Sequence, residues 1–325
     1  MNRDGVIPLT QALLLMDASA ALRYRVLTEL LGRPASERST ALLKSERESE
    51  IDDLLQHDGL RGTRDIAWRL CQLAHIGVDR RRARVRKLAD ALFARQRRDG
   101  SFPLADYMSG DRYDSIPLQT AIPLRALAAV GYAQDPRAER AYEWLLGQRI
   151  ADGSWPTGYA AGQLGYRADY RRLAGSTGCR ANTVGALACL VLHPKRAEST
   201  ATRVALQLVL LSGPGDRTQF GSEIARLVGV ERPRGFITFY SRSDAAFILS
   251  LAARAAFDSA NESLRSLVAF VVGLRDSYGL WTHERHPEVT RWLTFDILWS
   301  LQRLGLSEQS PGSAGPRETP RGSVF

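Results

Sequence analysis

The sequence has few of the residues and motifs that identify common classes of site. It contains only three cysteines, Cys71, Cys179 and Cys189, a number too small and odd for a disulfide framework. Cys71 and Cys189 lie in apolar helical segments, where a thiol usually packs as a small hydrophobic group. The chain also contains no phosphate-binding glycine loop, no dinucleotide-binding fingerprint and no hydrolase elbow. These absences argue against disulfide scaffolds, nucleotide-dependent enzymes and α/β-hydrolases.

Long apolar runs are missing as well. No run approaches the roughly 18 to 20 residues that a membrane-spanning helix needs. The apolar stretch near the N-terminus is interrupted by Asp4, Gln11 and Asp17, which disfavours a signal peptide. We therefore expect a cytoplasmic protein that is at most peripheral to a membrane.

The positive charge is concentrated in one segment. The net charge is +9, and residues 80–98 hold nine basic residues and a single acid, Asp90. Such a cluster could attract an anionic membrane surface or, as a less expected partner, nucleic acid. The alternative, which we favour, is a solvated outer face of a helix.

Helical periodicity runs through almost every long segment, and no segment shows the alternation of a half-buried strand. Two kinds of helix alternate along the chain. The first kind is apolar nearly all round and must be buried on every side: 64–77, 116–131, 181–192, 243–256 and 290–304. The second kind is amphipathic: 80–97, 135–149, 197–212 and 259–273. This alternation predicts an all-α fold, an α/α toroid of about five to six inner/outer helix hairpins in a single domain.

The ends of the chain differ from this pattern. Residues 1–58 are helical and are expected to form a cap that closes the ring, while residues 59–306 form the toroid. Residues 307–325 are rich in Pro, Gly and Ser, a composition typical of a disordered tail.

Three outer helices end in a similar way, with Gly one or two residues before a large side chain: QRRDGSF (96–102), QRIADGSW (148–155) and LRDSYGLW (274–281). Gly100 and Gly153 are 53 residues apart, and Gly153 and Gly279 are 126 apart, or twice 63. A glycine with positive φ ends a helix, and the aromatic side chain can then fold back between hairpins. The spacing therefore indicates an internal repeat.

This repeat resembles the QW repeats of squalene–hopene cyclases and oxidosqualene cyclases. The same ring of hairpins occurs in protein-prenyltransferase β-subunits, and the resemblance covers roughly residues 60–305. The third copy departs from the pattern because Leu274 stands in place of the Gln. The resemblance implies an isoprenoid-handling enzyme of terpenoid-cyclase or prenyltransferase type.

Loop lengths predict which end of the ring carries the site. The connections from outer to inner helices are long (98–115, 150–180, 213–242 and 274–289), so they gather on one rim, where the N-termini of the inner helices also meet. Helix N-termini favour anions. The expected ligand is a hydrophobic or amphipathic anionic small molecule such as a prenyl diphosphate. The candidate ligand-binding residues are Arg64, Arg112, Arg180, Arg242, Arg291, Tyr113, Tyr170, Tyr240 and Trp299. The alternative is that these arginines pair with loop carboxylates and the tyrosines pack loops.

Neither initiating motif of terpenoid cyclases is present. The string nearest to D-x-D-D is Glu50-Ile51-Asp52-Asp53, outside the repeats, and D-D-x-x-D fails at Gln56. The candidate catalytic residues are therefore single acids near the starts of inner helices: Asp244, Asp296 and Asp65. Each could be a proton donor with a raised pKa or a helix cap.

The resemblance to prenyltransferase β-subunits also raises the question of zinc. There an Asp, a Cys two residues later and a His bind the metal; here Asp244 is followed by Ala246, with His283 and His286 further on. Without the thiolate the set is incomplete for a tetrahedral site. We therefore expect no cofactor, with zinc or magnesium as lesser alternatives. The missing motifs also leave open a non-catalytic toroid that binds a hydrophobic ligand or a partner protein.

Overall fold

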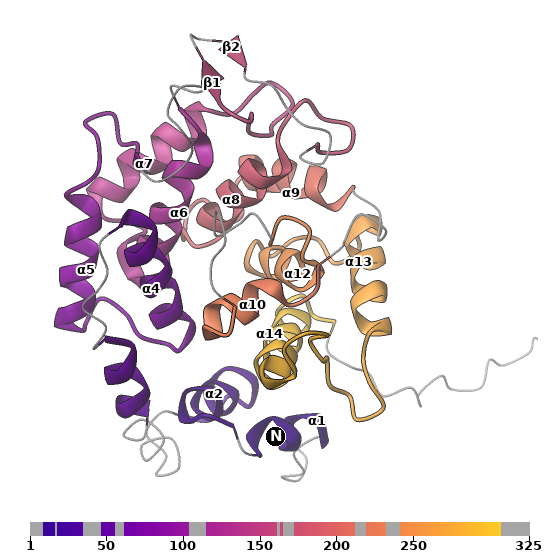
Figure 1. The fold of residues 1–325 in the computed structure, drawn as a ribbon. Helices are drawn as coiled ribbons and strands as arrows, with labels where there is room; N and C mark the ends of the chain where they lie inside the picture. Colours follow the sequence, from indigo (N-terminus) through magenta and orange to yellow (C-terminus); the bar gives the residue numbers. More distant parts are fainter. Residues whose placement is uncertain are drawn as a thin grey trace, which may run out of the picture.

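The computed structural model describes residues 9–16, 18–34, 47–55, 62–103, 115–160, 163–164, 172–211, 219–231 and 241–306. Within these ranges the regular structure is almost entirely helical (Figure 1). The exception is a short antiparallel pair, β1 (Tyr159–Ala160) and β2 (Gln163–Leu164), in which Tyr159 lies opposite Leu164. The all-α prediction is confirmed.

The nine helices predicted from the alternation are all present, in the predicted order. The inner helices are α4 (Thr63–His75), α6 (Pro117–Leu127), α8 (Arg180–Leu190), α12 (Ala245–Arg254) and α14 (Thr290–Arg303). The outer helices are α5 (Ala83–Phe93), α7 (Pro136–Gly147), α9 (Thr200–Leu210) and α13 (Glu262–Gly273). The first four inner helices each pack against the outer helix that follows, and α6 lies between α4 and α8 (Figure 1). This is the two-layered ring of an α/α toroid.

Burial separates the two layers as the sequence predicts. All the residues of α8 are buried, whereas α5 buries only Val85, Ala89, Leu92 and Phe93. Most basic side chains of residues 80–98 are exposed on or beside α5, as expected of a solvated outer face. No helix in the described ranges is long and apolar enough to cross a bilayer.

The N-terminal helices pack against the last inner helix. These are α1 (Leu9–Leu15), α2 (Ala20–Arg25) and the π-helix η1 (Val26–Leu30); α1 and η1 contact α14. Glu50 accepts hydrogen bonds from the backbone N–H groups of Ala20 and Ala21, at 2.8 and 3.2 Å. The acid that opens the string nearest to D-x-D-D therefore caps α2. The predicted boundary at residue 58 and the predicted tail 307–325 lie outside the described residues.

One α-helix in the described ranges was not predicted. α10 (Ser222–Val228) lies inside the expected loop 213–242 and packs against both α4 and α14, together with the 3-10 turn η5 (Pro287–Val289). It has only seven residues, too few to show a helical period. Gly221 and Gly229 flank it, both in left-handed conformation (φ 78° and 94°), and are the local signal of its two ends.

The three repeated turns share one backbone geometry. Gly100, Gly153 and Gly279 have φ values of 94°, 90° and 83°, which side chains rarely adopt. A Cβ on Gly100 would lie 2.4 Å from the carbonyl oxygen of Arg140, so backbone contact as well as φ requires glycine there.

A threonine of the next inner helix fastens each turn. The backbone N–H of the aromatic residue donates to the threonine hydroxyl in three equivalent bonds: Phe102 to Thr120 (3.0 Å), Trp155 to Thr183 (3.1 Å) and Trp281 to Thr294 (2.9 Å). Both tryptophans also donate their indole N–H, at 2.6 Å, to a carbonyl of the preceding outer helix. Each turn thus joins an outer helix to the next inner one.

Replacing Thr183 by Val tests this fastening. Valine keeps the volume but leaves the buried N–H of Trp155 without an acceptor, which we expect to lower the free energy of unfolding by about 1–3 kcal/mol. The measurement is urea unfolding followed by circular dichroism. Thr200→Val, at an exposed position of α9, is the control, with an expected change within about 0.5 kcal/mol. Equal stabilities for the two variants would contradict the proposed role of the threonine.

Candidate functional site

A cavity of about 200 Å³ lies inside the ring, lined by residues of all five inner helices together with α2 and α10. It lies toward the C-terminal ends of the inner helices, since His75 and Arg254 are the last residues of α4 and α12. The rim predicted from loop lengths is at their N-terminal ends. The helix α10 (Ser222–Val228), which lies within the long loop 213–242 of that rim, also lines the cavity, through Glu223, Ile224 and Leu227.

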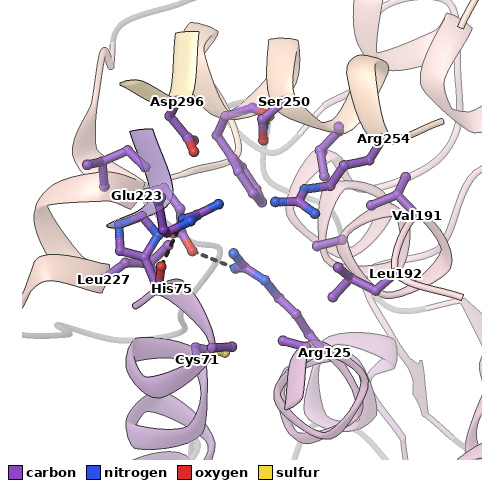
Figure 2. A pocket seen from close by; sticks show the side chains of 17 residues that line it. Cys71, His75, Arg125, Val191, Leu192, Glu223, Leu227, Ser250, Arg254 and Asp296 are labelled. Atoms are coloured by element: carbon purple, nitrogen blue, oxygen red, sulfur yellow. Dashed lines mark hydrogen bonds and ion pairs between the residues drawn. The ribbon is translucent and has the colours of Figure 1, made fainter. Parts of the chain in front are cut away.

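The lining combines small apolar side chains with a group of polar ones (Figure 2). The polar members are Arg25, His75, Arg125, Glu223, Ser250, Arg254 and Asp296. The rest of the lining consists of Ala, Val, Leu, Ile, Phe and Cys. A cavity of this kind can hold a hydrocarbon group beside a charged one.

Arg25 enters the cavity from α2 with its charge already balanced. Its Nε and Nη2 atoms donate to the two carboxylate oxygens of Glu29, at 2.6 and 2.8 Å. Its Nη1 atom donates to the backbone oxygen of His75 at 2.8 Å, and its guanidinium lies 4.6 Å from the ring centre of Phe295. Arg25 thus donates three hydrogen bonds to other groups of the protein.

Arg125 of α6 is balanced by Glu223 of α10. Its Nη1 atom lies 2.6 Å from a Glu223 oxygen, and Glu223 also lies 3.5 Å from Arg226 and accepts a hydrogen bond from Ser241. Burial opposes ionisation of Glu223, but the two guanidinium groups outweigh it and hold the pKa of this carboxyl below its ordinary value. Glu223 is therefore ionised, and it is shared between two arginines.

Arg254 and Asp296 face the same cavity without such partners (Figure 2). Among the described residues, neither side chain has a hydrogen bond or an ion pair within 4.0 Å; Arg254 only stacks on Trp299, 4.7 Å from its ring centre. Burial lowers the pKa of Arg254. Burial also raises the pKa of Asp296, against the opposing effect of Arg25 and Arg254.

His75 is a neutral group in this positive environment. Burial, with the charges of Arg25 and Arg254, holds its pKa well below the ordinary value. Its Nε2 atom is buried and has no hydrogen-bond partner within the described part of the chain. The ring is held against Trp292, with 4.4 Å between centres. A bound ligand could therefore hydrogen-bond to this nitrogen.

Asp244 caps the start of α12. It is fully buried at the start of α12, where its Oδ1 atom accepts from the backbone of Gly221 (3.0 Å), Ala246 (3.1 Å) and Phe247 (3.4 Å) and its Oδ2 atom from Glu223 (2.9 Å). Burial raises its pKa to about 6, although these N–H groups act in the opposite direction. Asp244 thus ties the start of α10 to the start of α12 and does not line the cavity.

The other predicted residues are placed as follows. Asp65 accepts a hydrogen bond from the backbone of Gly62 at 3.3 Å and caps α4. Arg64, Arg180 and Arg291 lie in the first turns of α4, α8 and α14, and Arg242 precedes α12, all away from the cavity. The indole ring of Trp299 stacks on the guanidinium of Arg254. Arg112, Tyr113, Tyr170 and Tyr240 lie outside the described residues. Of the predicted residues that the structure describes, only Asp296 lines the cavity.

The structure brings no metal ligands together in its described ranges: no group of three or more His, Cys, Asp or Glu side chains is placed to hold an ion. His283 and His286 are neighbours, with ring centres 5.0 Å apart, but Nδ1 of His283 already accepts from the backbone of Arg285 and of His286. The oxygens of Asp244 are likewise occupied by backbone N–H groups. These residues do not form the zinc set considered from the sequence.

The residues that sequence reasoning missed are Arg25, His75, Arg125, Glu223 and Arg254. Three of them lie on inner helices that are otherwise apolar. A charged side chain on a helix buried on every side must face a partner or a cavity. That signal was present at Arg125 and Arg254. Glu223 had no such signal, because α10 was not recognised as a helix.

No protein-family model matches this chain, and neither does any curated protein. Among solved structures it is similar to the type II terpene cyclase MstE from Scytonema. A variant bound to its substrate, geranylgeranyl dihydroxybenzoate, is 14% identical and aligns over 81% of this chain and 97% of that chain, with a TM-score of 0.33. The apo form is 14% identical over 74% and 87% (TM-score 0.29). A product complex with merosterolic acid A is 13% identical over 80% and 96% (TM-score 0.30). A likeness this weak assigns no ligand or reaction to this chain.

Replacing Asp244 by Asn tests its structural role. An amide supplies only one acceptor oxygen, so its NH₂ group would face backbone N–H donors, and we expect a loss of about 1–3 kcal/mol in the free energy of unfolding. The measurement is denaturant unfolding at pH 8. The control is Asp258→Asn, because Asp258 is exposed and accepts a single backbone hydrogen bond, from Ala260. A fully stable Asp244→Asn protein would show that these bonds do not hold α10 in place.

Proposed function

We propose that this chain is an isoprenoid-handling enzyme that binds a small amphipathic anion in its central cavity and exchanges a proton with it. The observation that supports this proposal most directly is Arg254. Its guanidinium is turned into the cavity, and no carboxylate lies within ion-pair distance of it in the described residues (Figure 2). Removing a guanidinium from water is costly unless an anion accompanies it, so a ligand's anionic group would stabilise this arrangement.

The rest of the cavity supports a hydrocarbon body. Val191 and Leu192 lie near Arg254 and Leu227 lies across the cavity, and all three are labelled in Figure 2. A dry apolar cavity of about 150 Å³ holds a molecule the size of benzene. At about 200 Å³, this cavity has room for one or two isoprene units rather than a long polyprenyl chain. We therefore propose a short isoprenoid acid or ester as the ligand.

Asp296 is the residue we propose for proton transfer. It faces the same space as Arg254, and its raised pKa brings both protonation states closer to neutral pH. In this scheme the carboxylate takes a proton from the bound ligand and the acid returns it to another carbon. His75, neutral and with a free Nε2 atom, would hydrogen-bond to the ligand beside it.

Replacing Arg254 by Met tests the proposal. Methionine keeps much of the apolar stem but removes the charge, so we expect at least a tenfold weaker binding of dimethylallyl and geranyl acids and phosphates. Binding is measured by isothermal titration calorimetry, and products are sought by mass spectrometry after incubation with the same compounds.

The matched control is Arg303→Met. Arg303 stacks on the same Trp299, at 5.0 Å from its ring centre, but does not line the cavity. We expect unchanged affinity in this variant. If none of the compounds binds the wild-type protein, or both variants bind alike, the cavity is not an anion site. Binding without any product would instead favour a non-catalytic toroid.

A further inference from the structure

The charges around the cavity nearly cancel, and this restricts the charge of its ligand. Arg25 and Glu29 form a balanced pair. Glu223 is shared by Arg125 and Arg226, which leaves one positive charge, and all three of these groups are buried. Among the described residues, the remaining charged groups that line the cavity are Arg254 and Asp296, of opposite sign. His75 is neutral. With Asp296 ionised, the cluster therefore carries a single net positive charge.

We infer that the cavity selects a singly charged anion, a carboxylate on a short branched hydrocarbon, over phosphate esters and diphosphates, and that Asp296 imposes this selectivity. The inference rests on the proposed function and specifies the ligand of the same site. One negative charge brings the cluster to neutrality. Each further charge on the ligand is in excess and lies in the same cavity as the Asp296 carboxylate.

The geometry of Arg254 supports a carboxylate. One face of its guanidinium is covered by Trp299, so its N–H groups are offered at the edge. Two oxygens of a planar carboxylate match two N–H groups of that edge. A diphosphate carries more charge and more acceptor oxygens than one guanidinium can satisfy. Arg125 cannot take them up without giving up its ion pair with Glu223, which is buried.

Asp296 is well suited to reject extra charge because no group in the described residues forms an ion pair with it. Its carboxyl group makes no hydrogen bond or ion pair in the described part of the chain. We expect the repulsion between this carboxylate and each additional ligand charge to weaken binding about tenfold. Asparagine has nearly the same shape and removes only the charge.

The experiment compares three ligands with the same five-carbon branched body: dimethylacrylate, dimethylallyl phosphate and dimethylallyl diphosphate. Calorimetric titrations at about pH 7.5, close to physiological pH, are run on the wild type and on Asp296→Asn. The matched control is Glu198→Gln, which removes a carboxylate from the exposed outer surface. Thermal unfolding establishes that each variant is folded before it is titrated.

For the wild type and the control we expect the carboxylate to bind at least tenfold more tightly than the monophosphate, and the diphosphate to bind most weakly. In Asp296→Asn we expect the ratio between carboxylate and phosphates to shrink at least tenfold. A wild type that prefers the diphosphate, or an Asn variant with unchanged ratios, would overturn the inference. Such a result would leave the proposed function standing as long as Arg254→Met weakens all three ligands. If no ligand binds the wild type, both proposals fail.

Discussion

Burial of a guanidinium group is tolerable only when an acceptor or a negative charge is buried with it, and this ring gathers four such groups around one cavity. Arg25, Arg125 and the half-buried Arg254 line the cavity, and the buried Arg226 lies beside them, 3.5 Å from Glu223. Arg125 and Arg254 lie on the inner helices α6 and α12 and face the cavity. Glu29 of η1 and Glu223 of α10 supply the carboxylates that pair with Arg25 and Arg125.

The helix α10 supplies the carboxylate that pairs with Arg125. The short helix lies between α4 and α14, the first and last inner helices, and brings Glu223 to Arg125. Asp244 accepts hydrogen bonds from the start of α10 and the start of α12 together, so the element that closes the ring is also the one that supplies the charge. Arg254 differs from the other arginines because no carboxylate pairs with it among the described residues, and the proposed ligand site follows from that difference.

Local patterns in the sequence were sufficient for the fold but not for the site. Apolar periodicity predicted nine helices and their two layers, because burial is a property of each helix by itself. The glycine–aromatic spacing predicted the repeated turns, although not the threonines that fasten them. The cavity depends on contacts between distant residues, such as Arg125 with Glu223, and no periodicity encodes such a pair. Loop length indicated the rim that includes 213–242, whose helix α10 lines part of the cavity, but it did not indicate the charged residues on the inner helices.

Arg254 forms no ion pair within the described residues, and we propose that a ligand's anionic group binds it. The most direct measurement is a crystal structure of the protein soaked in sodium bromide, with the anion located by anomalous scattering. The account predicts a bromide ion inside the cavity in contact with the guanidinium of Arg254. A cavity without bromide, in which Arg254 has turned to form a direct ion pair with Asp296, would contradict it.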